Sequence, residues 1–248
     1  MTIESDQDLQ GLRSAGRVVA LTLATMRSRA RAGMTTAELD AIGEDVLRAH
    51  GARSAPRVTY NFPGTTCISI NEEVAHGVPG ERVIQPGDMV NVDVSAELDG
   101  YFADTGASFV VPPSTPEKDR LCRSTHMALE HAMEHAVAGA PLNAIGKAIE
   151  STAKRQGYRV IRNLGSHGVG RALHEEPSCI LPYYEPRDRR RLHEGLVITI
   201  EPFLSTRARH VTEADDGWTL KGPPGTFAAQ YEHTLVITRG KPLVMTTL

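Results

Sequence analysis

Apolar side chains recur at helical intervals along residues 6–32, which predicts a long amphipathic helix that ends at Gly33. A second, shorter helix is predicted over residues 37–49, because Thr36 is a favourable N-cap residue in front of it. Residues 56–64 are expected to form a loop with a short strand. The pattern therefore places two helices ahead of the first sheet.

The same order of elements returns in the second half of the chain. Helical patterns cover residues 115–137 and 141–157, and extended segments follow them as they follow the first pair. A helix pair followed by a sheet, repeated once, predicts an α+β fold with two similar halves around a shared central site. We expect a single domain over residues 1–248, with halves at about residues 6–112 and 113–240.

Two aspartates close extended runs on either side of a predicted turn. Asp93 ends an alternating run and shares its face with Asn91, while Asp104 closes the next run. Asp99 and Gly100 between them supply the positive φ that a tight hairpin needs. Such a hairpin would hold two mutually repelling carboxylates together, and a divalent cation is the natural partner. Since a strand aspartate is more often simply solvated, the pair alone does not establish a metal site.

The second half repeats this arrangement with glutamates. Glu201 follows the β-branched run of residues 196–200, and Glu232 lies near the start of an extended segment over residues 230–237. Four converging carboxylates exceed what one cation requires, so we expect two hard divalent ions.

Three of the ten histidines occur in glycine-rich or turn segments, where side chains commonly project into clefts: His76, His167 and His174. The last is not part of a metalloprotease HExxH helix, because Pro177 and Ser178 follow it. One imidazole added to the carboxylates would favour manganese, iron, cobalt or zinc over calcium. Any one of these histidines, considered alone, is more often structural.

The composition is that of an ordinary globular chain, with 40% hydrophobic and 23% charged residues. The net charge of −3 argues against a general nucleic-acid or membrane-surface binder. No signal peptide or transmembrane run is visible, and Cys67, Cys122 and Cys179 lack metal-site or disulfide spacing. We therefore expect free thiols and a cytoplasmic protein. The arginine-rich residues 187–191 are expected to be a solvated turn, with an anionic partner as the weaker alternative.

Six motifs in order, NEEVAHGVPG, NVDV, DGYFADTG, SHGVGRALHEEP, VITIEPF and AQYEHT, resemble those of type I methionine aminopeptidases. The resemblance covers nearly the whole chain. It implies the pita-bread fold, with two pseudo-symmetric halves around a dinuclear metal site. It also implies an enzyme that removes the initiator methionine from nascent proteins by two-metal-assisted hydrolysis, with preference for a small second residue.

The resemblance assigns roles to particular residues. Two divalent ions (cobalt, manganese, iron or zinc) are implied, with five ligands: Asp93, Asp104, His167, Glu201 and Glu232. Asp104 and Glu232 would bridge the ions, and Glu201 would be the proton acceptor. His76 and His174 would contact the substrate around the scissile amide and act in catalysis.

The methionine pocket is expected, by the same resemblance, to contain Phe62, Cys67 and Trp218, with Tyr60 nearby. A thioether fits a pocket of aromatic and sulfur groups, although plain core packing is the alternative for each residue. The chain departs from the family pattern at Ser166, where glycine is usual, and at Leu173, where phenylalanine is common. These departures bear on side-chain preference and turnover.

The implied partners are nascent polypeptide N-termini, met at the ribosome, and we expect a monomer without nucleic-acid or membrane motifs. Two rival functions remain open. A peptidase of the same fold that acts on X-Pro bonds usually carries a large N-terminal domain, and a non-catalytic module would have lost ligands. The short spacing from Glu201 to Glu232 leaves no room for the insertion of type II enzymes, so a minimal bacterial-style type I enzyme is expected.

Overall fold

The computed structural model describes residues 1–248 and contains two long helix pairs and one short helix. The helices are α1 (Asp6–Arg29), α2 (Thr36–Ala49), α3 (Ala55–Tyr60), α4 (Pro116–Glu134) and α5 (Asn143–Gln156). The first helix ends at Arg29, three residues before the predicted end at residue 32. The N-cap of α2 is Thr35 rather than Thr36, because Thr35 and Glu38 bond to each other's backbone N–H groups in a capping box.

The strands form four sheets, whereas the repeated pattern predicts one sheet after each helix pair. They are β1 (Arg53–Ser54), β2 (Cys67–Ile70), β3 (Glu73–Ala75), β4 (Met89–Leu98), β5 (Tyr101–Val110), β6 (Arg159–Val160), β7 (Ser166–Gly168), β8 (Glu175–Ile180), β9 (Val197–Ile200), β10 (Phe203–Ser205), β11 (Thr212–Glu213), β12 (Leu220–Lys221), β13 (Ala228–Gln230), β14 (His233–Val236) and β15 (Leu243–Val244). The longest strands, β4 and β5, form a hairpin that is joined by β1 and β2. Its turn is the predicted one, with φ of 51° at Asp99 and 80° at Gly100.

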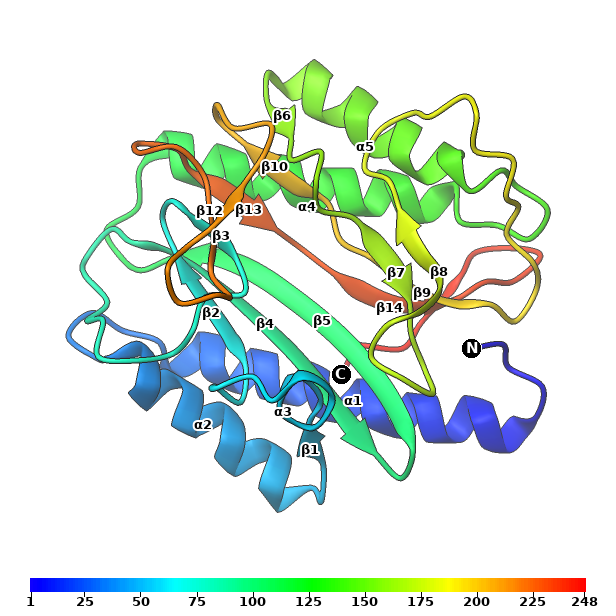
Figure 1. The fold of residues 1–248 in the computed structure, drawn as a ribbon, viewed down its shortest axis with the longest axis horizontal. Coiled ribbons are helices and arrows are strands. Elements are labelled where there is room, and N and C mark those ends of the chain that lie inside the picture. Colours follow the sequence, from blue (N-terminus) through cyan, green and yellow to red (C-terminus); the bar gives the residue numbers. More distant parts are fainter.

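The strands lie between the two helix pairs, with α1 and α2 on one side and α4 and α5 on the other (Figure 1). One apolar core joins α1 and α2 to the back of the β4–β5 hairpin, and a second joins α4 and α5 to β9, β10 and β14. The polar faces of these strands are thereby turned toward the middle of the molecule. This is the α+β arrangement that the sequence predicts.

Two segment predictions are wrong. Residues 56–64 begin with the helix α3 instead of a strand, since Ser54 caps it, Pro56 occupies its first turn and Asn61 ends it at a positive φ of 59°. The predicted strand over residues 230–237 is broken into β13 and β14, and Glu232 lies in the break. There the chain crosses from the sheet of β10 to that of β9.

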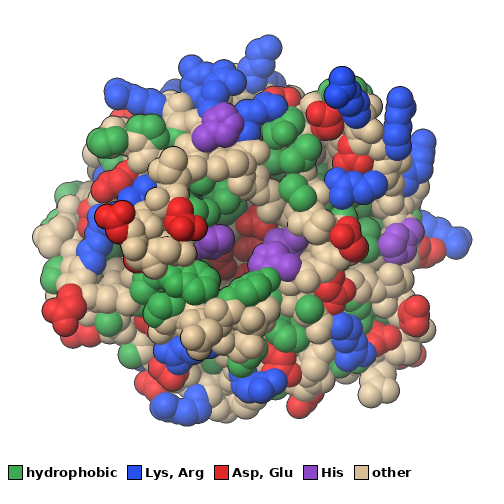
Figure 2. Space-filling model, in the orientation of Figure 1, with side chains coloured by type: hydrophobic (Ala, Val, Ile, Leu, Met, Phe, Trp, Pro, Cys, Tyr) green, Lys and Arg blue, Asp and Glu red, His purple; other side chains and the backbone are tan.

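One face of the molecule is hollowed at its centre, where histidine and acidic side chains are visible inside an otherwise mixed surface (Figure 2). Lysine and arginine gather along the upper edge of this view, over α5. The three cysteines are free thiols, as predicted. No helix combines the length and apolar character needed to cross a bilayer.

Candidate active site

The first two predicted ligands lie on the β4–β5 hairpin. Asp104 pairs with Ser95, and Asp93 pairs with Gly106, so the two carboxylates are diagonal neighbours on one face. This confirms the predicted convergence. Asp104 was predicted to end its extended run, but it lies within β5, which continues to Val110.

Glu232 reaches the hairpin at the crossing between β13 and β14. Its backbone N–H donates to the Gly106 carbonyl at 2.9 Å, and the Thr105 hydroxyl donates to its carbonyl at 2.8 Å. These bonds place its carboxylate beside Asp104. Ligand-type atoms of Asp104, His167 and Glu232 all lie within 4.8 Å of one another.

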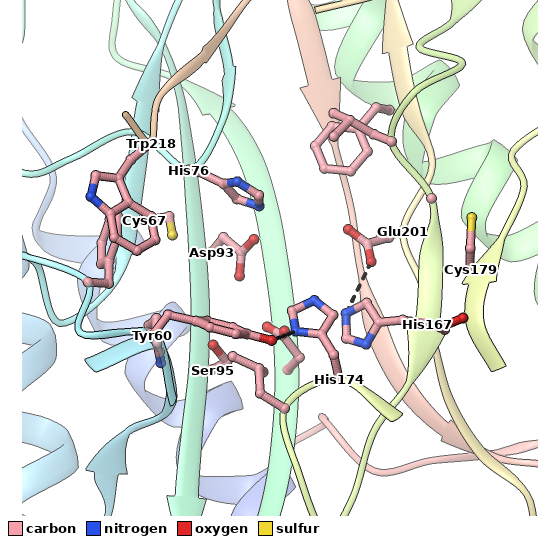
Figure 3. A pocket seen from close by; sticks show the side chains of 18 of the residues that line it. Tyr60, Cys67, His76, Asp93, Ser95, His167, His174, Cys179, Glu201 and Trp218 are labelled. Carbon is pink, nitrogen blue, oxygen red and sulfur yellow. Dashed lines mark hydrogen bonds and ion pairs between the residues drawn. The ribbon is translucent and has the colours of Figure 1, made fainter. Parts of the chain in front are cut away.

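His167 comes from β7, on the opposite side of the site from the hairpin (Figure 3). Its Nδ1 lies 2.9 Å from the Gly168 carbonyl, and since a carbonyl only accepts, Nδ1 carries the proton. Nε2 is therefore left with its lone pair, 3.5 Å from Glu201 Oε1. A backbone bond of this kind is what orients a metal-binding imidazole.

The cluster buries four carboxyl groups close together without a cationic side chain among them, and the pKa values of these groups are shifted accordingly. Burial raises the pKa of Asp104 to about 6. Burial, followed by the charge of Asp104, raises the pKa values of Asp93, Glu201 and Glu232 well above their ordinary range. Burial lowers the pKa of His167 to about 3, so this imidazole is neutral near neutral pH.

Two carboxylate oxygens in this cluster, Asp104 Oδ1 and Glu232 Oε1, are buried without any hydrogen-bond partner. Buried polar atoms are almost always paired, so unpaired oxygens facing a neutral imidazole indicate a missing positive group. The donor set therefore fits a divalent cation.

Polar side chains behind the cluster hold its carboxylates in place. Gln230 Nε2 donates to Glu232 Oε2 at 3.0 Å, and Asn91 donates to Gln230 at 2.8 Å. The Thr199 hydroxyl donates to Glu201 Oε1 at 3.1 Å. These supporting residues were not predicted. Their signal was present in the alternation, because Asn91 precedes Asp93, and Thr199 precedes Glu201, by two positions on the same strand face.

The departure at Ser166 has a structural consequence. Its hydroxyl accepts a hydrogen bond of 2.9 Å from the backbone N–H of Glu201 and so ties β7 to the end of β9. The serine side chain is buried and does not enter the pocket lining.

A pocket of about 310 Å³ opens above the cluster. Its lining includes Asp93, Asp104, His167 and Glu201 together with the predicted substrate residues Tyr60, Phe62, Cys67, His76, His174 and Trp218. The Phe62 and Trp218 rings meet edge to face, 5.2 Å apart, and Cys67 lies beside them (Figure 3). The structure thus brings every predicted substrate residue to one cavity, and Leu173 also lines it.

The pocket contains further residues for which the sequence offered no signal: Pro56, Ser95, Asn163, Leu164, Gly165, Ser178, Cys179 and Phe203. Three of them lie in the loop over residues 163–165 and the other five belong to α3, β4, β8 and β10, so their approach to the cavity depends on the path of the chain in space. Cys179, predicted only as a free thiol, is an exposed thiol at this cavity.

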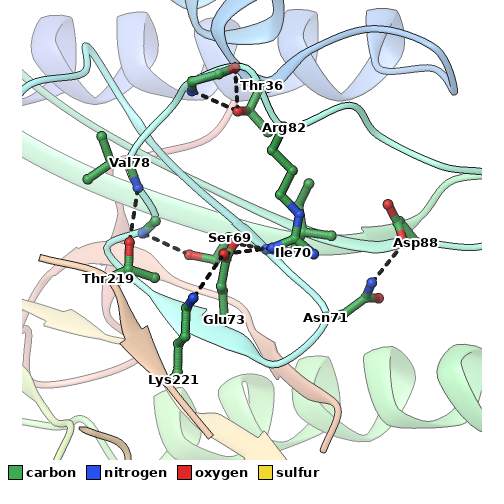
Figure 4. Close-up of polar contacts among 12 residues, drawn as sticks. Thr36, Ser69, Ile70, Asn71, Glu73, Val78, Arg82, Asp88, Thr219 and Lys221 are labelled. Carbon is green, nitrogen blue, oxygen red and sulfur yellow. Dashed lines mark hydrogen bonds and ion pairs between the residues drawn. The ribbon is translucent and has the colours of Figure 1, made fainter. Parts of the chain in front are cut away.

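The turn that carries His76 is firmly anchored, although His76 itself has a positive φ of 54°. The Gly77 N–H donates to the Ser69 hydroxyl at 3.0 Å, and the Val78 N–H donates to the Thr219 hydroxyl at 3.4 Å (Figure 4). These bonds tie the turn to β2 and to the segment that follows Trp218. His76 can therefore keep its place at the pocket without support from its own side chain.

The cluster of buried carboxylates and a histidine beneath a pocket is typical of a metal-dependent enzyme. A family model described as metallopeptidase family M24 matches residues 10–239. The chain belongs to metallopeptidase family M24.

Relatives within family M24 match over the full chain. Methionine aminopeptidase 2 of Bacillus subtilis is 46% identical over 249 aligned residues, which cover 100% of both chains. The crystal structure of a methionine aminopeptidase from Thermotoga maritima superposes with a TM-score of 0.95 at 31% identity, again over 100% of both chains. A prolidase from Pyrococcus furiosus shares the fold, with a TM-score of 0.80, 22% identity, and coverage of 100% of this chain and 66% of its own. The predicted pita-bread fold is confirmed.

Proposed function

We propose that this M24 metallopeptidase is a methionine aminopeptidase that removes N-terminal methionine, with preference for a small second residue. The observation that carries the proposal is the Asp104–His167–Glu232 cluster, of which Asp104 and His167 line a pocket that also contains aromatic and sulfur groups. The full-length similarity to proteins named methionine aminopeptidase supports it.

The residues proposed to hold two divalent ions are Asp93, Asp104, His167, Glu201 and Glu232. Mixed carboxylate and imidazole donors suit manganese, iron, cobalt or zinc. Bound there, the ions would supply Lewis-acid polarisation of the scissile carbonyl and a water of lowered pKa.

Three side chains would handle the substrate and its protons. Glu201 is proposed as the proton acceptor, because the Thr199 hydroxyl orients its carboxylate and Glu201 lines the pocket where the scissile amide would lie. His174 would donate a hydrogen bond to the carbonyl oxygen of the first residue, where negative charge develops. His76, on its anchored turn, would contact the amide nitrogen side.

The methionine side chain is proposed to occupy the space beside Phe62, Cys67 and Trp218. The edge-to-face aromatic pair presents a rigid apolar wall, and a flexible thioether makes favourable contacts with such rings. Plain core packing does not account for this cluster fully, because Trp218 and Cys67 are only partly buried and line a cavity.

Peptide hydrolysis tests the proposal. Chelator-stripped protein, resupplied with manganese, should release methionine from Met-Ala-Ser and norleucine from the norleucine analogue, whose side chain has a similar shape. It should act poorly on Met-Leu-Ser and on Ala-Pro-Ser. Preference for Ala-Pro-Ser would instead establish the X-Pro alternative, and metal binding without hydrolysis of any peptide would leave a non-catalytic module.

We propose further that the protein acts on nascent chains at the ribosome, as a monomer. A groove of about 770 Å³ beside α5 supports the placement at the ribosome, since it is lined by five cationic side chains, Lys147, Lys154, Arg159, Arg162 and Arg209. Its one acidic residue, Glu150, is paired with Arg162 at 3.4 Å. The groove is therefore positive in a chain of net charge −3, as a phosphate-rich surface requires.

Sedimentation with ribosomes tests this placement. The wild-type protein should pellet with ribosomes at low salt and dissociate from them as the salt concentration rises. The double variant Lys154→Glu with Arg159→Glu should bind ribosomes with an affinity at least about tenfold lower. Arg48→Glu, an exposed charge reversal on α2, serves as the control and should pellet like wild type. Equal pelleting of the groove variant and the control would contradict the proposal.

A further inference from the structure

Tyr60 contacts the catalytic-site histidine rather than the Phe62–Trp218 wall. Its hydroxyl oxygen lies 2.6 Å from His174 Nδ1, and the two rings are 5.6 Å apart and tilted by 51°. Tyr60 comes from α3 in the first half of the chain, whereas His174 precedes β8 in the second (Figure 3). The bond therefore spans the pocket between residues that are 114 positions apart.

The support of Tyr60 is rigid enough to give this bond a defined direction. Tyr60 is the last residue of α3, and Asn61 closes the helix in the left-handed region with its N–H bonded to the Arg57 carbonyl. Phe62, directly beyond, is buried with only 4% exposure and anchors the segment inside the molecule. Tyr60 itself remains 45% exposed at the rim, so its ring is placed by the helix rather than by burial.

A tyrosine hydroxyl can either donate to a histidine nitrogen or accept from it, and the surroundings of this bond favour donation to Nδ1 of His174. The Tyr60 hydroxyl makes no other hydrogen bond to the protein, so its proton is available to Nδ1. A ring that accepts at Nδ1 carries its proton on Nε2. Nε2 faces the centre of the pocket, where Asp93 and Glu201 also point (Figure 3). In the opposite tautomer a lone pair would face those carboxylates and the substrate carbonyl, which is unfavourable.

The face of the His174 ring is also confined. The His167 ring lies 4.0 Å away, centroid to centroid, at a tilt of 39°. With His167 against its face and Tyr60 at its edge, rotation of the His174 ring would break the bond to Tyr60.

We propose that Tyr60 is a positioning residue that holds the His174 ring with its Nε2–H directed at the carbonyl oxygen of the substrate's first residue. The identity of that substrate rests on the proposed aminopeptidase function, whereas the orientation of the ring does not. Hydrogen-bond donors that are already oriented toward developing charge lower the barrier without reorganisation during the reaction.

Tyr60→Phe removes the hydroxyl and keeps the ring. It therefore distinguishes a role of the hydroxyl in orienting His174 from a role of the ring in lining the pocket. For Met-Ala-Ser we expect kcat to fall about tenfold, the loss of one hydrogen bond acting in the transition state, while KM changes less than about twofold. In a His174→Ala background, Tyr60→Phe should have no further effect, because Tyr60 acts through His174. Tyr184→Phe, at an exposed tyrosine outside this pocket, is the matched control and should retain wild-type kcat.

Three results would overturn the proposal: wild-type kcat in Tyr60→Phe, a rise in KM alone, or full additivity with His174→Ala. A rise in KM alone would instead make Tyr60 part of the methionine pocket wall.

Nitrogen-15 NMR of the histidine side chains decides the matter without reference to activity. His174, assigned by the signal lost in His174→Gln, should be the Nε2–H tautomer in the wild type and a mixture in Tyr60→Phe. An unchanged tautomer in Tyr60→Phe would overturn the proposal even in an active enzyme. If the protein cleaves no methionine peptide but the tautomer shifts as expected, the proposed function fails and the positioning role stands.

Discussion

Asp104→Asn is expected to lower kcat/KM for Met-Ala-Ser by at least about 100-fold, since even residues behind a metal ligand commonly contribute that much. The carboxylate is 7% exposed and lies within ligand distance of both His167 and Glu232. The amide has nearly the same shape but no charge, so it would leave the positive ions with one fewer compensating group. Calorimetric titration of Asp104→Asn with manganese should show a lower affinity, or one bound manganese ion fewer per chain, than the wild type.

The control for this variant is on the same hairpin. Asp99→Asn makes the same chemical change in the turn, where asparagine tolerates the positive φ of 51°. It should retain wild-type turnover and metal binding. Full activity in Asp104→Asn, with Asp99→Asn also active, would show that Asp104 is not a ligand.

Removal of metal is expected to abolish turnover and to make thermal stability depend on pH. The folded-state pKa of Asp104 is raised to about 6 by burial, and the pKa values of Asp93, Glu201 and Glu232 are raised further. A raised carboxyl pKa stabilises the folded state below the ordinary carboxyl pKa, and this contribution is lost as pH rises through the folded-state value. The metal-free protein should therefore lose stability between about pH 4 and neutrality.

Bound cations reverse this trend, because they compensate the charges that form as pH rises. The melting temperature with saturating manganese should exceed that of stripped protein by about 5–10 °C at neutral pH, and by little near pH 4, where protons compete for the ligands. Calorimetric or fluorescence melting of both forms across this range gives the measurement. Asp99→Asn should behave as wild type, and a gap between the two forms that does not vary with pH would contradict the assignment of the cluster.

Ser166 and Leu173, which depart from the family pattern, occupy different positions relative to the pocket. Ser166 lies behind the site and bonds to the backbone of Glu201, so it bears on how β7 and β9 hold the ligands. Leu173 lines the pocket, next to His174, so it bears on the shape that a substrate meets.

The sequence by itself determined the elements whose cause is local. The Asp99-Gly100 turn and the alternation around it specify the hairpin, and with it the approach of Asp93 to Asp104, because turn geometry and side-chain period act over a few residues. Helical periodicity likewise located both long helix pairs. The same strand pattern pointed to Glu201 and Glu232, and the glycine-rich loop pointed to His167 as a candidate. The resemblance assigned these residues their roles and named the pocket, while the division into halves at residues 6–112 and 113–240 stays a prediction.

Only the tertiary structure decided how distant segments meet. Glu232 occupies a break between two sheets because its backbone bonds to β5, far away in the sequence, and no local pattern encodes that crossing. The helix α3 is a different case, because its Ser54 cap and its left-handed end at Asn61 are local signals that the sequence analysis missed. The bond from Tyr60 to His174 joins residues that are 114 positions apart, so it depends on how α3 and the segment before β8 approach each other across the pocket and follows from neither segment alone.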